Sequence, residues 1–369
     1  MQRLSSLVFV VLVCIFSGCS RKPADRLVAL RQTVVSNSPQ GRVVPSLVYR
    51  VYQVDGQGHV APFPHSFPPG YMGTVQGSTQ PKPSPDGRWI AYGNRAEDYD
   101  IHLLNVRTSH QHTITRWGRP PTIGSVSVDV LIDGWSPGSR RLLLYTTSGE
   151  DLFGQGRLAV PNACYGFYEY DVASRKVTAV PLPKSFGFVA WLRNGRFVGV
   201  IPGRLPADDK LVLLRPGEAG QTEIRAVNTF PYQARVSRDR KWLVGLHSES
   251  GRLPGKGTAR IVKVNLRTMA ATPLVALASW SGNEQPTLSP DDKQVAYKRQ
   301  ASHTGLYFAI QESLYVDTRQ MYSCSGMIDF EWVDSGRIVL ACHDQVLVLD
   351  TNSAKTLSNY KLAPVQTPH

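Results

Sequence analysis

Short apolar runs that directly follow tight-turn sequences dominate the hydrophobic pattern of this chain. The clearest case is the turn sequence Ser-Pro-Asp-Gly-Arg at residues 84–88, followed by Trp-Ile-Ala-Tyr at residues 89–92. Proline presets its backbone angle for an early turn position, Asp can bond the backbone two residues on, and Gly tolerates the left-handed conformation. The apolar run has strand length and residues that suit a buried pleated surface. The stretch therefore predicts a corner between two antiparallel strands.

Degenerate copies of this turn-and-strand pattern recur down the chain. The positions equivalent to Ser84 are residues 84, 136, 192, 237, 289 and 333. A period of about 40–50 residues with several short strands per repeat is typical of a β-propeller. We therefore expect an all-β protein, a β-propeller of six four-stranded blades, with seven blades as the alternative.

A second kind of turn recurs within the repeats. An Asn or Asp is followed by Thr or Ser, whose side chains cap turns, at residues 105–108, 171–174, 265–268 and 350–353. A short strand follows each of these turns. Each repeat thus predicts one four-stranded blade, in the order strand, Ser-Pro-Asp-Gly turn, strand, variable loop, strand, Asx-type turn and strand. Such a blade cannot bury both faces alone, so the blades are expected to stack in a ring.

The first residues predict an export signal. Arg3 precedes an apolar run of about ten residues, which is too short to span a bilayer as a helix. The sequence Phe-Ser-Gly-Cys at residues 16–19 resembles the lipobox of bacterial lipoproteins. This resemblance implies that Cys19 becomes the first mature residue and carries acyl chains such as palmitate. Ser20 resembles the residue found in outer-membrane-directed lipoproteins. The alternative is an ordinary secretory signal with an incidental Cys.

The sequence before the first repeat divides into three expected parts. Residues 1–18 are the signal peptide, residues 19–46 a lipidated tether, and residues 47–369 the propeller with a closing N-terminal hairpin. The hairpin, at about residues 47–63, either pairs with the last blade or belongs to a seventh blade.

The repeats resemble those of the periplasmic propeller protein TolB and its relatives, which are similar to WD40 repeats. The resemblance covers residues 83–358 and is best at residues 84–92 and 289–297. No TolB-type amino-terminal domain fits before the first repeat. The resemblance therefore implies the fold and a general role in binding other proteins. It does not imply membership of the Tol–Pal system.

The formal net charge is +13. For an exported protein this favours anionic lipid, glycan or an acidic protein as partner rather than nucleic acid. A cation follows each Ser-Pro-Asp-Gly-type turn and would form a basic rim on one end of the ring: Arg88, Arg140, Arg196, Lys241, Lys293 and Arg337. A solvated turn edge explains these cations more simply than an anion-binding rim does, because exposed charges are common.

Five cysteines are present. Cys14 lies in the signal, and Cys19 is the expected lipid site. Cys324 and Cys342 are expected at the same end of neighbouring strands. In an oxidising compartment they could form a disulfide, and the sequence does not decide between the bonded and the free form. Cys164 is expected to be a buried structural thiol.

Binding is expected on the end of the ring opposite to the repeated turns, where the loops differ in length and composition. The candidate binding residues in these loops are Phe153, Arg157, Tyr165, Arg252, Lys256 and His303. The glycine-rich stretch at residues 251–257 misses the phosphate-loop pattern.

No catalytic residue, metal site or cofactor is predicted. His110 and His112 could offer two ligands on one strand, but no third ligand can be placed beside them. The leading hypothesis is a non-enzymatic, lipid-anchored envelope protein that binds another periplasmic or outer-membrane protein. The alternatives are a binder of anionic glycan or lipopolysaccharide and, less favoured, a metal-dependent polysaccharide lyase.

Overall fold

The computed structural model describes fourteen stretches of the chain. They are residues 25–37, 43–65, 67, 81–94, 100–115, 129–147, 166–183, 185–203, 208–248, 258–281, 284–300, 311–326, 328–342 and 345–361. Within these stretches, no helix is both long enough and apolar enough to cross a membrane.

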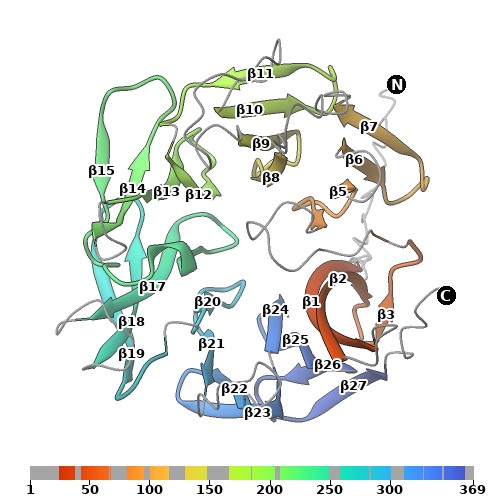
Figure 1. Ribbon diagram of the computed structural model, residues 1–369. Helices are drawn as coiled ribbons and strands as arrows, with labels where there is room; N and C mark the ends of the chain where they lie inside the picture. The colour runs from red at the N-terminus through yellow and green to blue at the C-terminus, as the bar shows by residue number, and fades with distance from the viewer. Residues whose placement is uncertain are drawn as a thin grey trace, which may run out of the picture.

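Seven antiparallel sheets stand around a central axis, so the protein is a seven-bladed β-propeller (Figure 1). Six sheets have four consecutive strands each, with the first strand innermost. They are β4 (Lys82–Pro83) to β7 (Gln111–Thr115), β8 (Asp129–Trp135) to β11 (Val177–Val180), β12 (Gly187–Trp191) to β15 (Gln221–Glu223), β16 (Arg235–Val236) to β19 (Ala271–Leu277), β20 (Thr287–Leu288) to β23 (Arg319–Ser325), and β24 (Ile328–Asp334) to β27 (Thr356–Lys361).

The strands inside these blades are short. They are β5 (Trp89–Asn94), β6 (Asp100–Asn105), β9 (Arg141–Thr147), β10 (Gly166–Asp171), β13 (Phe197–Ile201), β14 (Lys210–Leu214), β17 (Trp242–Ser248), β18 (Ala259–Asn265), β21 (Val295–Gln300), β22 (Gln311–Val316), β25 (Arg337–Cys342) and β26 (Gln345–Asp350). The predicted turn-and-strand repeat is confirmed in each of the six blades. A 3₁₀ turn at Pro231–Gln233 precedes β16.

The remaining blade is a three-stranded N-terminal sheet, and it corrects two expectations. It consists of β1 (Arg26–Asn37), β2 (Val43–Val54) and β3 (Val60–Pro62). The favoured count of six blades is therefore wrong, and the alternative of seven is confirmed. Residues 26–37, expected in the tether, form a strand paired with β2, so the propeller begins near residue 26 and not at residue 47. The hairpin at residues 47–63 does belong to this seventh blade.

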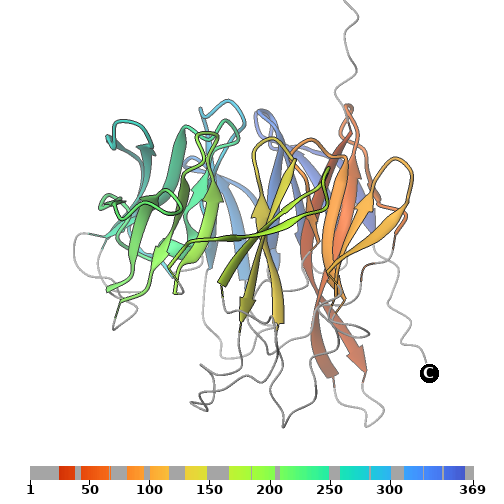
Figure 2. The same ribbon diagram turned by 90° about the horizontal axis from the view of Figure 1, so that it is seen from above.

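The two ends of the ring differ in their connections (Figure 2). The first and second strands of each four-stranded blade, and its third and fourth strands, are joined at one end, which we call the turn end. All other connections between strands in these blades lie at the opposite end, the loop end. β1 starts at the turn end, because an Arg26 Nη1 donates to the Val333 carbonyl, 2.6 Å away, in the turn after β24. β1 therefore runs opposite to the first strands of the other blades.

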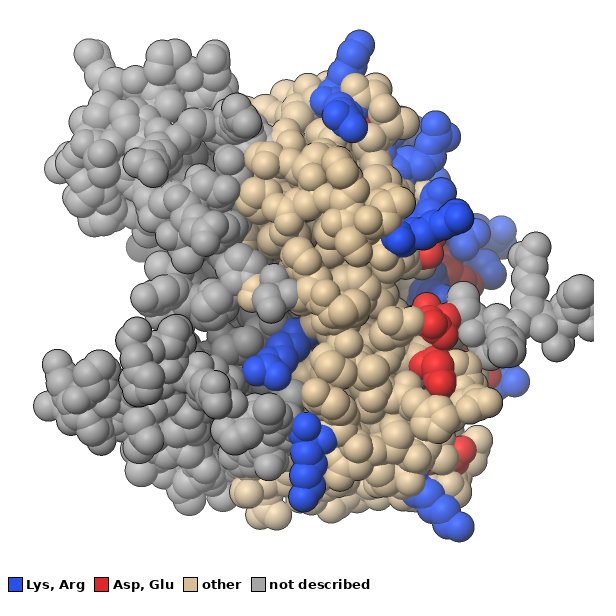
Figure 3. Space-filling view, turned by 90° about the vertical axis from the view of Figure 1, so that its right-hand side faces the viewer, with Lys and Arg blue, Asp and Glu red and all other residues tan. Residues whose placement is uncertain are grey.

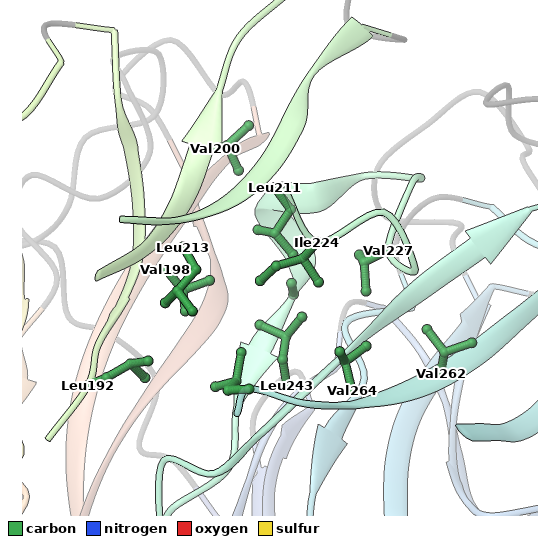
Figure 4. Close-up of a cluster of buried hydrophobic side chains, with 12 residues drawn as sticks. Leu192, Val198, Val200, Leu211, Leu213, Ile224, Val227, Leu243, Val262 and Val264 are labelled. Carbon is green, nitrogen blue, oxygen red and sulfur yellow. The ribbon is translucent and has the colours of Figure 1, made fainter. Parts of the chain in front are cut away.

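Apolar side chains from neighbouring blades fill the space between sheets. One such cluster joins β13 and β14 to β17 and β18 and includes Val198, Leu213, Leu243 and Val264, all at most 1% exposed (Figure 4). The N-terminal sheet packs in the same way on both sides, through Val28 and Tyr52 against the last blade and through Leu27 against the blade of β4–β7. Among the described strands, each blade is one continuous stretch of chain and no strand is shared between the first and last blades, so face-to-face packing closes the ring.

Three further contacts fasten the blade of β20–β23 to the last blade at the loop end. A disulfide joins Cys324 in β23 to Cys342 at the end of β25. The other two contacts come from an ion pair within the first of these blades, in which Lys298 Nζ lies 3.5 Å from Glu312 Oε2 and both side chains are fully buried. The same Nζ donates to the Ile328 carbonyl at 2.9 Å, while the Ile328 N–H donates to Glu312 at 2.7 Å.

Candidate functional site

A buried serine closes the repeated turn at the turn end. Ser84 Oγ donates to the Asp86 carboxylate at 2.7 Å and accepts from the Trp89 N–H at 3.0 Å. Ser237 and Ser289 make the same pair of bonds in their own turns, and all three serines are at most 4% exposed. The polar groups of these turns therefore satisfy one another, which indicates a structural role.

The fourth position of this turn is left-handed in several blades. Gly87 has φ 71°, and Asp292 takes the equivalent position with φ 60°. Asp292 Oδ1 is buried and has no hydrogen-bond partner among the described residues, and burial raises the pKa of this carboxyl.

Replacing Asp292 with Gly is therefore expected to stabilise the protein by about 1 kcal/mol, because it removes left-handed strain and a buried unpaired oxygen. The bond from Lys263 Nζ to the Asp292 carbonyl, at 2.7 Å, uses the main chain and survives the change. Urea unfolding measures the difference, with Gly87→Asp as the reverse control, which should destabilise. A less stable Asp292→Gly protein would contradict this interpretation.

The basic rim exists, but most of its cations are neutralised locally. Arg88, Lys241, Lys293 and Arg337 each form an ion pair with an aspartate of their own turn, at distances from 2.5 to 3.7 Å. Hydrogen bonds and the neighbouring cation lower the pKa of Asp86 despite its partial burial, so this carboxyl stays ionised. Arg140 and Arg196 have no acidic residue in their turns. The four local pairs support the simpler explanation of a solvated turn edge.

A second set of cations lies further from the axis at the same end. The turn between the third and fourth strands of every four-stranded blade carries at least one exposed Lys or Arg, namely Arg107, Arg175, Lys176, Arg215, Arg267, Arg319 and Lys355. The turns of Arg107 and Arg267 are capped by Asn105 and Asn265 in place of a carboxylate. Figure 3 shows Lys and Arg gathered toward one edge of the described surface, with fewer Asp and Glu among them.

The wall around the axis is charged, which the sequence did not lead us to expect. First strands of neighbouring blades contact one another along the ring. Their charged residues include Lys82, Asp133, Arg235, Asp329 and Glu331, joined by Arg26 and Arg31 of β1. Asp329 and Glu331 alternate with buried Ile328 and Trp332, so they point away from the interblade core.

Contacts along this wall cross between blades. An Arg26 Nη2 lies 2.7 Å from Glu331 Oε1, and the Arg31 N–H donates to Asp329 Oδ2 at 2.6 Å. The second bond satisfies a backbone group on the side of β1 that has no strand partner. On the other side of β1 along the ring, Lys82 Nζ in β4 donates to the Asp133 carbonyl in β8 at 2.7 Å. These contacts bind the blades together and leave a polar lining.

Burial raises the pKa of Asp133 to about 7, and Lys82 only partly opposes that shift. Because the folded-state pKa is raised, the stability that this group contributes is present below about pH 4 and is lost as the pH rises through 7. We therefore expect Asp133→Asn to be more stable than the parent by at least about 1 kcal/mol at pH 8 and nearly equal to it at pH 4. Thermal unfolding at both pH values measures this, and an equal gain at both would contradict the assigned pKa.

Of the two histidines considered as metal ligands, His112 takes part in packing. His112 Nε2 lies 3.1 Å from the Tyr170 hydroxyl across a blade boundary, and burial lowers the pKa of His112. Its ring packs edge-on against Trp89, whereas His110 is exposed. Within the described stretches, no group of three potential metal ligands comes together.

The loop residues predicted to bind a partner lie outside the described residues. This applies to Phe153, Arg157, Tyr165, Arg252, Lys256 and His303, and also to Cys19 and Cys164. The described strand ends that flank residues 249–257 and 301–310 lie at the loop end. The Cys324–Cys342 disulfide left open by the sequence is present.

The charged axial wall could have been found from one signal in the sequence. Charged residues occupy alternate positions in the first strand of a repeat, as at Asp329 and Glu331. In an isolated sheet such residues would face solvent at the surface. In a propeller, the first strands of all the blades together line the central axis.

Comparisons with known proteins agree with the propeller fold. No protein-family model and no curated protein matches the sequence. Among solved structures, TolB from Acinetobacter baumannii is 15% identical with a TM-score of 0.45, over 90% of this chain and 63% of that one. The putative TolB from Agrobacterium tumefaciens is 13% identical with a TM-score of 0.39, over 80% of this chain and 98% of that one.

An enzyme structure is also similar to this chain. A structure from a study of two prolyl endopeptidases is 13% identical with a TM-score of 0.50, over 93% of this chain and 50% of that one. This chain thus spans less than two thirds of the Acinetobacter TolB and half of the peptidase. At 13% identity, the likeness to the peptidase concerns the fold alone.

Proposed function

We propose that the protein is a non-enzymatic, lipid-anchored envelope protein whose propeller is a scaffold for another envelope protein. In this proposal, acyl chains on Cys19 hold it at the outer membrane, facing the periplasm. The partner binds at the loop end. The proposal needs no cofactor and no nucleic acid.

The contrast between the two ends of the ring carries the proposal. At the turn end, each repeat uses its polar side chains internally, as the bonds of Ser84, Ser237 and Ser289 show. At the loop end, the connections between second and third strands differ from blade to blade, from residues 95–99 to residues 148–165. Variable segments on a rigid scaffold are where binding residues usually lie.

Recovery of a partner from detergent-solubilised envelopes tests the binding role. A tagged full-length protein should retain a stable partner, and Phe153→Ala combined with Arg252→Ala and Lys256→Ala should reduce its recovery at least tenfold. The matched turn-end control is Arg88→Ala combined with Lys241→Ala and Lys293→Ala, which should retain the partner. Loss of the partner only in the turn-end variant would contradict the proposal.

Cell fractionation tests the anchor separately. The parent protein should sediment with membranes, and Cys19→Ala should appear in the soluble periplasmic fraction. A Cys19→Ala protein that remains with the outer membrane after a high-salt wash would contradict lipid anchoring.

A further inference from the structure

The start of β1 shows at which end of the ring the N-terminal segment joins the propeller. Arg26 contacts Val333 and Glu331 beside the turn after β24, and it pairs with Val54, the last residue of β2. The first strand of the propeller therefore begins at the turn end, and it is the innermost strand of its sheet (Figure 1). The last described strand, β27, also starts at the turn end, so the described chain ends at the loop end.

The segment between the expected lipid site and the ring is short. Residues 20–25 alone separate Cys19 from Arg26. At roughly 3.5 Å per residue, a fully extended segment reaches about 25 Å at most. With the tether expected over residues 19–46, the ring could have taken any orientation, but a tether that ends at Arg26 keeps the turn end near the anchor.

The turn end also carries an excess of cations. Its inner set, Arg88 and its equivalents, is largely paired with aspartates of the same turns. Its outer set includes Arg107 and Arg267, whose turns contain no carboxylate. Charges of this kind attract an anionic surface within a Debye length of about 8–10 Å.

We propose that the turn end of the ring lies against an anionic phospholipid surface and holds the loop end away from it, toward the partner. This inference rests on the proposed acylation of Cys19. The lipid anchor brings the surface close, and the outer cations set the orientation. The turns at that end are short and internally bonded, without long loops among the described residues.

Quenching of a fluorescent probe by lipid headgroups tests the orientation. The acylated full-length protein, in a Cys164→Ser background, is placed in vesicles of phosphatidylethanolamine and phosphatidylglycerol that contain a headgroup spin label. One variant carries the probe at Ala173→Cys, in an exposed turn at the turn end, and the other at Ala278→Cys, exposed after β19 at the loop end. We expect quenching to be at least threefold stronger at position 173.

Two outcomes separate failure of the orientation from failure of the anchor. Protein that sediments with the vesicles but shows equal quenching at both positions, or stronger quenching at 278, overturns the inference and leaves anchoring intact. Protein that does not sediment with the vesicles overturns the anchoring, and the inference with it.

The role of charge is tested on the same vesicles. Arg107→Gln with Arg267→Gln should reduce quenching at position 173 about threefold on anionic vesicles and leave it unchanged on neutral ones. Lys210→Gln with Arg225→Gln removes two exposed loop-end cations and is the matched control, with no expected change. An equal effect of the two double variants would overturn the role of the outer cations.

Discussion

Replacing Glu312 with Gln is expected to lower the free energy of unfolding by about 3 kcal/mol, the largest effect of any single change considered for this protein. The amide keeps an acceptor for the Ile328 N–H but leaves the Lys298 ammonium without its counter-charge. Burial already lowers the pKa of Lys298, because the charged form is costly away from water. Urea unfolding of the purified protein measures the loss.

Removing both charges should cost less than removing one. Lys298→Met combined with Glu312→Gln leaves no uncompensated ion, so we expect this double variant to be more stable than Glu312→Gln alone. The matched surface control is Glu218→Gln, which breaks the exposed pair with Arg215 at 3.1 Å and should cost less than about 1 kcal/mol. A Glu312→Gln protein as stable as this control would show that the buried pair is not ionised.

Loss of the Cys324–Cys342 disulfide is expected to destabilise the protein by about 3 kcal/mol. The bond closes a segment with a sequence separation of 18, and constraining a loop of this length in the unfolded chain has an effect of that size. The double variant Cys324→Ala with Cys342→Ala should therefore unfold at a lower urea concentration than the oxidised parent.

Reduction of the parent provides the internal control for this prediction. Dithiothreitol should lower the stability of the parent to near that of the double variant, and it should leave the double variant unchanged. Both cysteines lie at the loop end of adjacent blades, so we also expect weaker recovery of a loop-end partner after reduction. Equal stability of the parent with and without reductant would contradict the prediction.

The repeated blades could be predicted from the sequence because their determinants are local. The Ser-Pro-Asp-Gly turns and the apolar runs after them are complete within about ten residues, as at residues 84–92. The bonds of Ser84 to Asp86 and Trp89 show why this spacing recurs. Each turn forms the same way whatever blade it belongs to.

The N-terminal blade could not be predicted in the same way. It lacks the repeated turn sequence, and Leu27 to Leu30 form a continuous apolar run rather than an alternating one. Val28 and Leu27 pack against different neighbouring blades, so both faces of β1 are buried. Strands buried on both faces show no alternation of apolar and polar residues, which is why this stretch resembled a tether.

The charges around the axis depend on long-range assembly. Arg26 and Glu331 are 305 positions apart, and nothing local in either segment predicts their contact. Closing a ring of seven blades brings the first strands together, and only then do Lys82, Asp133 and Asp329 share one lining. The loop-end binding residues remain a prediction from sequence, since they lie outside the described residues.

The central claim is that the loop end meets a protein partner while the turn end faces the membrane. Photo-crosslinking in intact cells tests it most directly, with p-benzoylphenylalanine at position 278 of the loop end and, separately, at position 173 of the turn end. We expect a discrete protein crosslink from position 278 and none from position 173. A protein crosslink from position 173 alone would contradict it.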